Sequence, residues 1–167
     1  PGYGWHADAI KFDWQDLRAN KDREIERLNQ VYDKLLNTAG VEIINGTGTL
    51  VDGHTVAVGD KTYTAERVLI AVGGWPWMPE VPGIEHAITS NEAFYLDSLP
   101  ERIVIVGGGY IAVEFAGIFN GLGVETLLCY RGELFLRGFD EDLRTHLAQE
   151  LPKKGIHLHF NTDITRI

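Results

Sequence analysis

The sequence predicts an α/β fold in two parts. In the second half, short apolar stretches alternate with segments of helical periodicity, in the order strand, helix, strand, helix, strand. Right-handed crossovers between such strands give a doubly wound parallel sheet. The first half instead combines one long helix with a small antiparallel β-meander, and a proline-rich stretch separates the two halves.

The composition limits the classes of function that the chain can serve. Of its 167 residues 44% are hydrophobic, enough for packed cores, and no apolar run reaches the ~20 residues of a membrane span. The net charge of −9 argues against nucleic acid and anionic membrane surfaces as partners. Cys129 is the only cysteine, so we expect no disulfide and no cysteine-based metal site. A single cysteine without a recognisable signal peptide favours the reducing cytoplasm.

The first half begins with a helix that we expect from about Trp14 to Thr38. Asp13 can cap its N-terminus, and apolar residues recur on one face at helical spacing. Further strands are expected at residues 41–45 and 67–72, because both are short apolar runs. Turn residues separate the three strands of the meander, which we expect at residues 49–51, 55–58 and 61–64.

A connector follows between residues 75 and 83. It holds three of the six prolines, so it can be neither a helix nor a central strand. We expect the chain to cross from one domain to the next here. Ser90 is then expected to cap a short helix that runs through Tyr95.

The strongest motif follows residue 100. Ile103–Val106 is predicted to be a buried strand, and Gly107, Gly109 and Ala112 then match the G-x-G-x-x-G/A spacing of dinucleotide-binding turns. Gly107 allows the sharp turn, Gly109 lets a pyrophosphate approach the backbone, and Ala112 lets the next helix pack closely on the sheet. That helix is expected to bury one apolar face, made of Ile111, Phe115, Ile118, Phe119 and Leu122. We therefore predict a Rossmann-like unit with phosphates at the helix N-terminus.

The end of the second strand indicates which dinucleotide binds. Units that bind NAD usually end this strand with an acid that bonds the ribose 2′-hydroxyl. Here the strand ends at Tyr130, followed by Arg131 and, six residues later, Arg137. Two guanidinium groups match the charge and the oxygens of a 2′-phosphate. The pattern therefore favours NADP(H) over NAD(H), whereas the nearby acid Glu133 lies beyond the strand end.

Several motifs along the chain occur together in one known family. They are Arg27-Leu28-Asn29 with Tyr32, the run Val68 to Gly74, the connector Pro79 to Gly83, the stretch Gly107 to Glu114, and Arg131 and Arg137 followed by Phe139-Asp140. The chain resembles the pyridine nucleotide–disulfide oxidoreductases, most of all the central part of the glutathione reductases. The resemblance covers nearly all of the sequence. Related lipoamide dehydrogenases carry an acid where this chain has Tyr130.

The resemblance implies two partial domains joined by a connector, and two cofactors, FAD and NADPH. Residues 1–75 would be part of an FAD-binding domain, residues 76–100 the connector, and residues 101–167 part of an NADPH-binding domain. Gly48 would contact FAD, and Tyr32 would reach glutathione disulfide, the implied substrate. The full-length protein would be a homodimer.

The resemblance also assigns roles around the fingerprint. Tyr110 would cover the flavin face and move aside when NADPH enters. Glu114 would pair with a lysine near the flavin. The residues that would bind NADPH are Gly107, Gly108, Gly109, Ile111, Ala112, Glu114, Arg131 and Arg137. Gly108, Ile111 and Glu114 would lie on the nicotinamide side, and the two arginines at the 2′-phosphate.

The chain lacks the redox cysteine pair and the His-Glu acid/base pair of this family. Its sequence also begins without methionine, so we expect a fragment of a longer enzyme that is inactive alone. A related reductase of the trypanothione or lipoamide type is the close alternative. A nucleotide-binding module without redox chemistry is the alternative from another class, and a Cys-x4-Cys pair encoded upstream would distinguish it from the enzyme.

Overall fold

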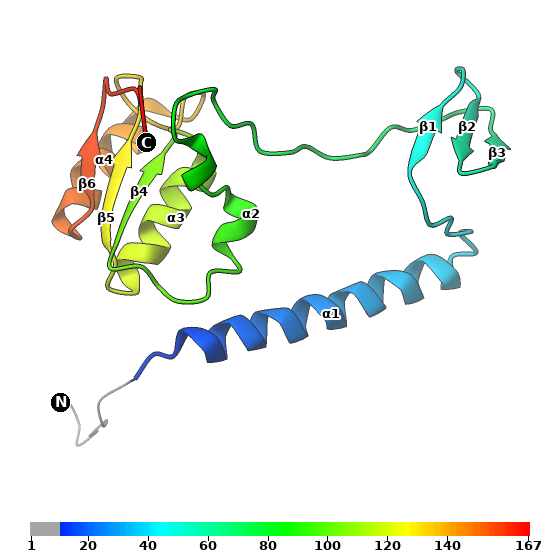
Figure 1. Ribbon diagram of the computed structural model, residues 1–167, viewed down its shortest axis with the longest axis horizontal. Helices are drawn as coiled ribbons and strands as arrows, with labels where there is room; N and C mark the ends of the chain where they lie inside the picture. The colour runs from blue at the N-terminus through cyan, green and yellow to red at the C-terminus, as the bar shows by residue number, and fades with distance from the viewer. Residues whose placement is uncertain (1–10) are drawn as a thin grey trace. The chain divides into compact units, whose positions relative to one another are not determined.

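The computed structural model describes residues 11–167, which form two compact units. One unit runs from Ala19 to Trp75, and the other comprises the described residues up to Arg18 together with Pro76–Ile167. Each unit contains a three-stranded sheet (Figure 1). The first ten residues of the domain expected at 1–75 lie outside the described part of the chain.

The long helix α1 spans Trp14–Thr38, as the sequence predicts. Asp13 begins it, because its Oδ1 accepts hydrogen bonds from the amides of Gln15 at 2.8 Å and Asp16 at 3.0 Å. The indole of Trp14 donates to the carbonyl of Leu96 at 2.7 Å, within the same unit. No residue of α1 is buried, so its apolar face is exposed in the described chain.

The β-meander is also confirmed. It consists of β1 (Gly48–Leu50), β2 (Thr55–Val58) and β3 (Lys61–Thr64), which pair antiparallel in that order. Gly46 has a φ of 147°, and a Cβ there would lie 2.5 Å from Val58 Cγ1. The glycine is therefore needed where the chain enters β1.

The strands expected at residues 41–45 and 67–72 are wrong: both segments are extended chain without strand pairing. Leu69 and Val72 are 88% and 89% exposed. A strand forms only where a neighbouring strand satisfies its backbone N–H and C=O groups, and none pairs with these segments among the described residues. Their apolar composition alone does not make strands of them.

The connector leads into a short 3-10 helix, η1 (Ile84–His86), and the short helix α2 (Ser90–Ala93). The cap of α2 is Thr89, one residue before the expected Ser90. The Thr89 hydroxyl accepts from the amide of Asn91 at 3.2 Å, and Glu92 Oε2 accepts from the Thr89 amide at 2.7 Å. Thr89 and Glu92 therefore form a reciprocal capping box.

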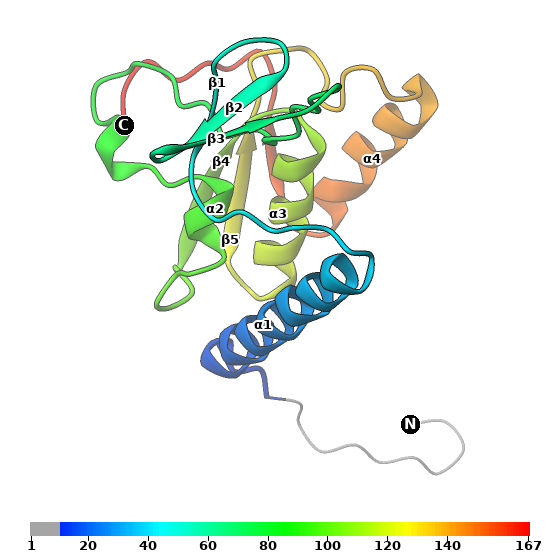
Figure 2. The ribbon, with the colours of Figure 1, turned by 90° about the vertical axis from the view of Figure 1, so that its right-hand side faces the viewer.

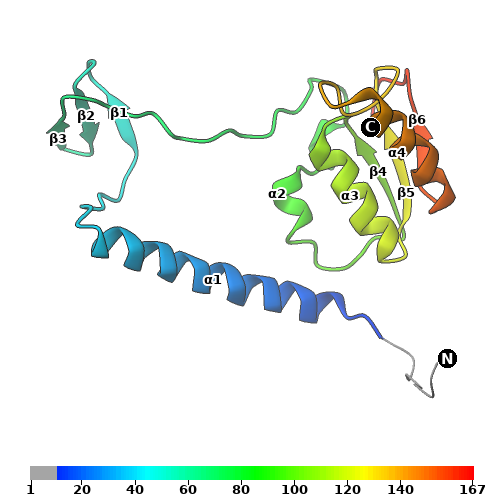
Figure 3. The ribbon, with the colours of Figure 1, turned by 180° about the vertical axis from the view of Figure 1, so that it is seen from behind.

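The second half forms the predicted parallel sheet, in the order β4 (Arg102–Val106), β5 (Glu125–Cys129) and β6 (His157–His159). Helix α3 (Tyr110–Gly121) connects β4 to β5, and α4 (Glu141–Lys153) connects β5 to β6. Both helices lie on the same face of the sheet, in front of it in Figure 3 and to its right in Figure 2. This is the β-α-β-α-β arrangement expected from the sequence.

The core of this unit lies between the sheet and the two helices. It has two clusters of buried residues, Ala116, Leu128, Phe135, Leu136 and Ile156 in one and Ala93, Phe119 and Val124 in the other. The face expected for α3 is partly wrong, because Ile111 and Ile118 are 44% and 46% exposed. Ala112 and Ala116 face the core in their place, since small side chains allow the helix to approach the sheet closely.

The structure predicts a clear difference between two leucines of this unit. Leu128→Ala should lower the free energy of unfolding by about 2–5 kcal/mol, because Leu128 is fully buried and leaves a cavity. Leu143 on α4 is 52% exposed, so Leu143→Ala is the matched control and should cost about 0.5 kcal/mol or less. Urea denaturation measures both, and equal costs would contradict the core described above.

Candidate functional site

The glycine-rich turn after β4 has the geometry of a phosphate-binding turn. Gly107 has a φ of 151°, and its amide donates to the carbonyl of Cys129 at the end of β5 at 2.9 Å. A Cβ on Gly107 would lie 3.3 Å from the Cβ of Ala112. Only small residues at both positions allow the turn to lie this close to the start of α3.

Gly109 leaves room for a ligand at the N-terminus of α3. It is the N-cap residue, and no side-chain hydrogen bond caps the helix. A Cβ added to Gly109 would have no atom of the chain within 4 Å, so the space over this residue is open. The first amide groups of a helix lack partners within the helix and attract anions. These features fit the pyrophosphate of a dinucleotide.

Gly108 is required because the Tyr130 ring packs against it. A Cβ at this position would lie 2.4 Å from the ring of Tyr130, and one on Gly132 would lie 2.6 Å from the other edge of that ring. The ring thus packs between two glycines at the carboxyl end of β5. Tyr130 thereby occupies the place where an NAD-binding unit carries its acid.

The loop after β5, residues 131–139, is attached to the glycine-rich turn. The amide of Leu136 donates to the carbonyl of Gly108 at 2.6 Å. Leu136 has a φ of 56°, a left-handed conformation that costs a non-glycine residue about 1–2 kcal/mol. Burial of its side chain, 6% exposed, offsets this cost. The backbone is thus held in one conformation directly before Arg137.

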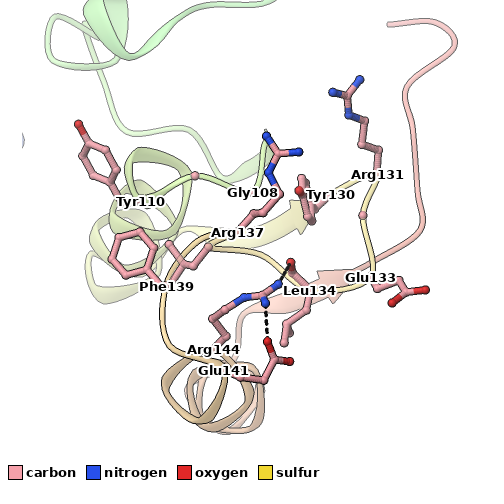
Figure 4. Close-up of a pocket in the computed structure, with 13 residues that line it drawn as sticks. Gly108, Tyr110, Tyr130, Arg131, Glu133, Leu134, Arg137, Phe139, Glu141 and Arg144 are labelled. Atoms are coloured by element: carbon pink, nitrogen blue, oxygen red, sulfur yellow. Dashed lines mark hydrogen bonds and ion pairs between the residues drawn. The ribbon is translucent and has the colours of Figure 1, made fainter.

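A pocket of about 960 Å³ lies between the turn and this loop. Its lining comprises Gly108, Gly109, Tyr110, Tyr130, Arg131, Gly132, Glu133, Leu134, Leu136, Arg137, Phe139, Glu141 and Arg144 (Figure 4). Three arginines against two glutamates make the lining net positive. In Figure 4, Arg131 and Arg137 extend away from α4, whereas Glu133 leaves the loop in another direction.

The structure brings together four of the eight residues expected to bind NADPH: Gly108, Gly109, Arg131 and Arg137. Gly107 and Ala112 do not line the pocket, but they contact each other within the turn. Ile111 and Glu114 lie further along α3 and are exposed. Tyr110, the residue expected on the flavin side, begins α3 and lines the pocket, and the residue is 56% exposed.

The expected substrate and FAD residues belong to the Ala19–Trp75 unit. Tyr32 lies on α1 and is 62% exposed. Gly48 lies in β1, where a Cβ would come 3.3 Å from Val56 Cγ1, so pairing with β2 already accounts for the glycine. The contact between Gly48 and FAD and the role of Tyr32 remain predictions. Among the described residues, no cluster of three or more His, Cys, Asp or Glu side chains could hold a metal ion.

Sequence reasoning missed Arg144, Glu141 and Leu136. Arg144 lies four residues after Asp140, whose carboxylate caps α4 by accepting from the amides of Asp142 and Leu143. Side chains on a helix lean toward its N-terminus, so an arginine at this position reaches back over the preceding loop. That spacing was a usable signal. The left-handed backbone at Leu136 had none, because leucine rarely adopts it.

Comparison with known proteins identifies the family. Residues 3–167 match the family described as pyridine nucleotide-disulphide oxidoreductase. The chain belongs to this family. Family membership implies a flavin and a nicotinamide cofactor, and the described pocket fits the nicotinamide dinucleotide by its open turn and its paired arginines. No helix among the described residues is long and apolar enough to cross a membrane.

Individual relatives agree with this assignment. The chain is 46% identical over 166 residues to the glutathione reductase of Nostoc sp., covering 99% of this chain and 36% of the relative. It is 44% identical over 181 residues to the trypanothione reductase of Leishmania donovani, covering 99% of this chain and 37% of that protein. The solved flavoprotein disulfide reductase RclA from Escherichia coli has a TM-score of 0.82 and 27% identity, over 93% of this chain and 37% of RclA. The chain therefore spans little more than a third of these relatives.

The environment of Cys129 lowers the reactivity of its thiol. Cys129 is half-buried in β5, and burial raises the pKa of its thiol. At neutral pH, a smaller share of Cys129 is therefore thiolate than in free cysteine. The half-buried thiol therefore fits a packing role better than a redox centre.

We expect iodoacetamide to alkylate Cys129 more slowly than an unfolded cysteine near neutral pH. The midpoint of the rate against pH should also lie higher, because the folded pKa is raised. The same protein unfolded in urea is the control, and its rate should rise to that of free cysteine. Folded protein that reacts as fast as unfolded protein would contradict the described burial.

Proposed function

We propose that this chain is part of an NADPH-dependent flavoenzyme that reduces glutathione disulfide. The observation that carries the proposal is the pair Arg131 and Arg137 beside the glycine-rich turn, with Tyr130 in place of an acid. Two guanidinium groups offer the charge and the forked donors that a 2′-phosphate accepts. An NAD-binding unit would present a carboxylate to the ribose instead.

In this proposal the residues of the chain bind and orient the dinucleotide. The amides at the N-terminus of α3 and the open space over Gly109 receive the pyrophosphate, and the loop arginines receive the 2′-phosphate. When bound, NADPH would supply the hydride and FAD the redox centre between NADPH and a disulfide. Tyr110, at the pocket end of α3, covers the flavin side, and Glu114 pairs with a lysine there. Tyr32 contacts the disulfide substrate.

Glutathione disulfide is the proposed substrate because glutathione reductases are among the relatives with 46–49% identity. Because the chain is also 44% identical to a trypanothione reductase, trypanothione disulfide is the second candidate substrate. The whole protein is proposed to be a cytoplasmic homodimer, and the 167-residue chain alone is proposed to be inactive.

The test uses the full-length protein that carries this segment. It should be yellow from bound flavin and should oxidise NADPH when glutathione disulfide is added. Trypanothione disulfide in place of glutathione disulfide separates the two candidate substrates. A colourless protein that binds the dinucleotide but reduces neither disulfide would favour a nucleotide-binding module without redox chemistry.

Replacing both Arg131 and Arg137 with glutamine should abolish most of the preference for NADPH over NADH. Each lost charge-assisted hydrogen bond is worth about 1.5–3 kcal/mol, or roughly ten- to hundredfold in kcat/KM per arginine. Arg67→Gln is the control, because the Arg67 side chain is 92% exposed and lies outside this pocket. Wild-type protein that uses NADPH and NADH equally would refute the phosphate site.

Tyr110→Gly should leave the Kd for NADP⁺ largely unchanged, because the ring is proposed to cover the flavin and not to hold the nucleotide. Calorimetric titration of the full-length variant measures this Kd. Tyr110→Phe serves as control, since it retains the ring. Loss of NADP⁺ binding in the glycine variant alone would show that the ring contacts the nucleotide directly.

A further inference from the structure

Arg144 is bound to the loop that carries the two phosphate-site arginines. Its Nε donates to the carbonyl of Phe135 at 2.8 Å, and its Nη2 donates to the carbonyl of Leu134 at 2.7 Å. Its Nη1 forms an ion pair with Glu141 Oε2 at 2.5 Å. The side chain is only 16% exposed. All three nitrogens of the guanidinium group are therefore used within the chain, and Figure 4 shows the bonds to Leu134 and Glu141.

These bonds complete a continuous set of anchors along the loop. The carbonyls of Leu134 and Phe135 bind Arg144, and the next amide, that of Leu136, binds the carbonyl of Gly108. Leu136 is held in the left-handed conformation with a φ of 56°. A backbone in this region persists only where its surroundings enforce it. Arg137 follows directly, so its starting direction depends on these anchors.

Arg144 differs from Arg131 and Arg137 in the direction that its guanidinium group faces. The Arg144 group faces the loop backbone and Glu141, whereas Arg131 and Arg137 extend from the loop on the side away from α4 (Figure 4). A guanidinium that already donates to two carbonyls and a carboxylate has few donors left for a ligand. Arg144 lines the same pocket, but its contacts fit support of the loop better than capture of a phosphate.

We propose that Arg144 is a positioning residue for dinucleotide selectivity: by holding the carbonyls of Leu134 and Phe135, it sets Arg137 at the 2′-phosphate. The inference rests on the proposed function of the pocket. Charge alone is insufficient for this role, because one side chain must reach two successive carbonyls and Glu141 at once. A planar fork does so, whereas a lysine ammonium on its flexible stem does not.

The experiment compares Arg144→Met, which retains the aliphatic stem, with Arg144→Lys, which retains the charge. Each variant is made in the full-length protein with flavin bound. Calorimetry gives the Kd of 2′,5′-ADP and of 5′-AMP, which differ only by the 2′-phosphate. Lys153→Met is the control, because Lys153 pairs with Glu150 on the same helix and lies outside the pocket. Thermal unfolding of all variants reports their stability.

Both Arg144 variants should bind 2′,5′-ADP roughly tenfold more weakly, the effect of one displaced charge-assisted bond. Binding of 5′-AMP should change by less than about twofold, and the control should match the wild type. If Arg144→Met does not fold, Arg144→Lys alone decides the question.

Three results would overturn the role of Arg144. If Arg144→Lys bound 2′,5′-ADP as tightly as the wild type, the positive charge at position 144 would act directly on the phosphate. Equal weakening of both ligands, or a lower Tm with unchanged binding, would mean that Arg144 only stabilises the fold. A wild-type protein that binds both ligands equally would instead overturn the proposed NADPH site, so the two failures are distinguishable.

Discussion

The hydrogen bond from the amide of Leu136 to the carbonyl of Gly108 joins the two parts of the site. It connects the glycine-rich turn after β4 to the loop after β5 at 2.6 Å. The Tyr130 ring fills the space beside it, which explains why positions 108 and 132 carry no side chain. Without this connection, the turn and the loop on the two sides of the pocket could move independently. In the proposed site, this contact and the anchors from Arg144 together set the distance between the turn and the phosphate-site arginines.

Local sequence signals predicted the elements that depend on local interactions. Helix α1 begins at its Asp13 cap, and the meander strands are separated by their turn residues. The segments at 41–45 and 67–72 were mistaken for strands because a strand also needs a partner, which no local pattern reveals. Likewise, Ile111 and Ile118 matched an apolar face, but close packing on the sheet favoured the alanines of α3.

The site shows the same division. The glycine-rich turn and the arginines beyond Tyr130, both singled out from the sequence, line one pocket, because each follows the carboxyl end of a parallel strand. The sequence reasoning did not single out the residues that hold the loop between the two arginines in place. Leu136 adopts a conformation typical of glycine, and Arg144 acts through two backbone carbonyls that any residues could supply. Only tertiary contacts distinguish Leu136 from an ordinary loop residue, whereas the spacing of Arg144 after its helix cap was a local signal that the sequence reasoning did not use.

The central claim is that the loop after β5 recognises a 2′-phosphate. An experimental structure of the full-length protein with NADP⁺ tests it most directly. The account predicts phosphate oxygens within hydrogen-bond distance of both Arg131 and Arg137, with Arg144 still bound to the carbonyls of Leu134 and Phe135. A 2′-phosphate that points to solvent, or a carboxylate that bonds the ribose in its place, would contradict it.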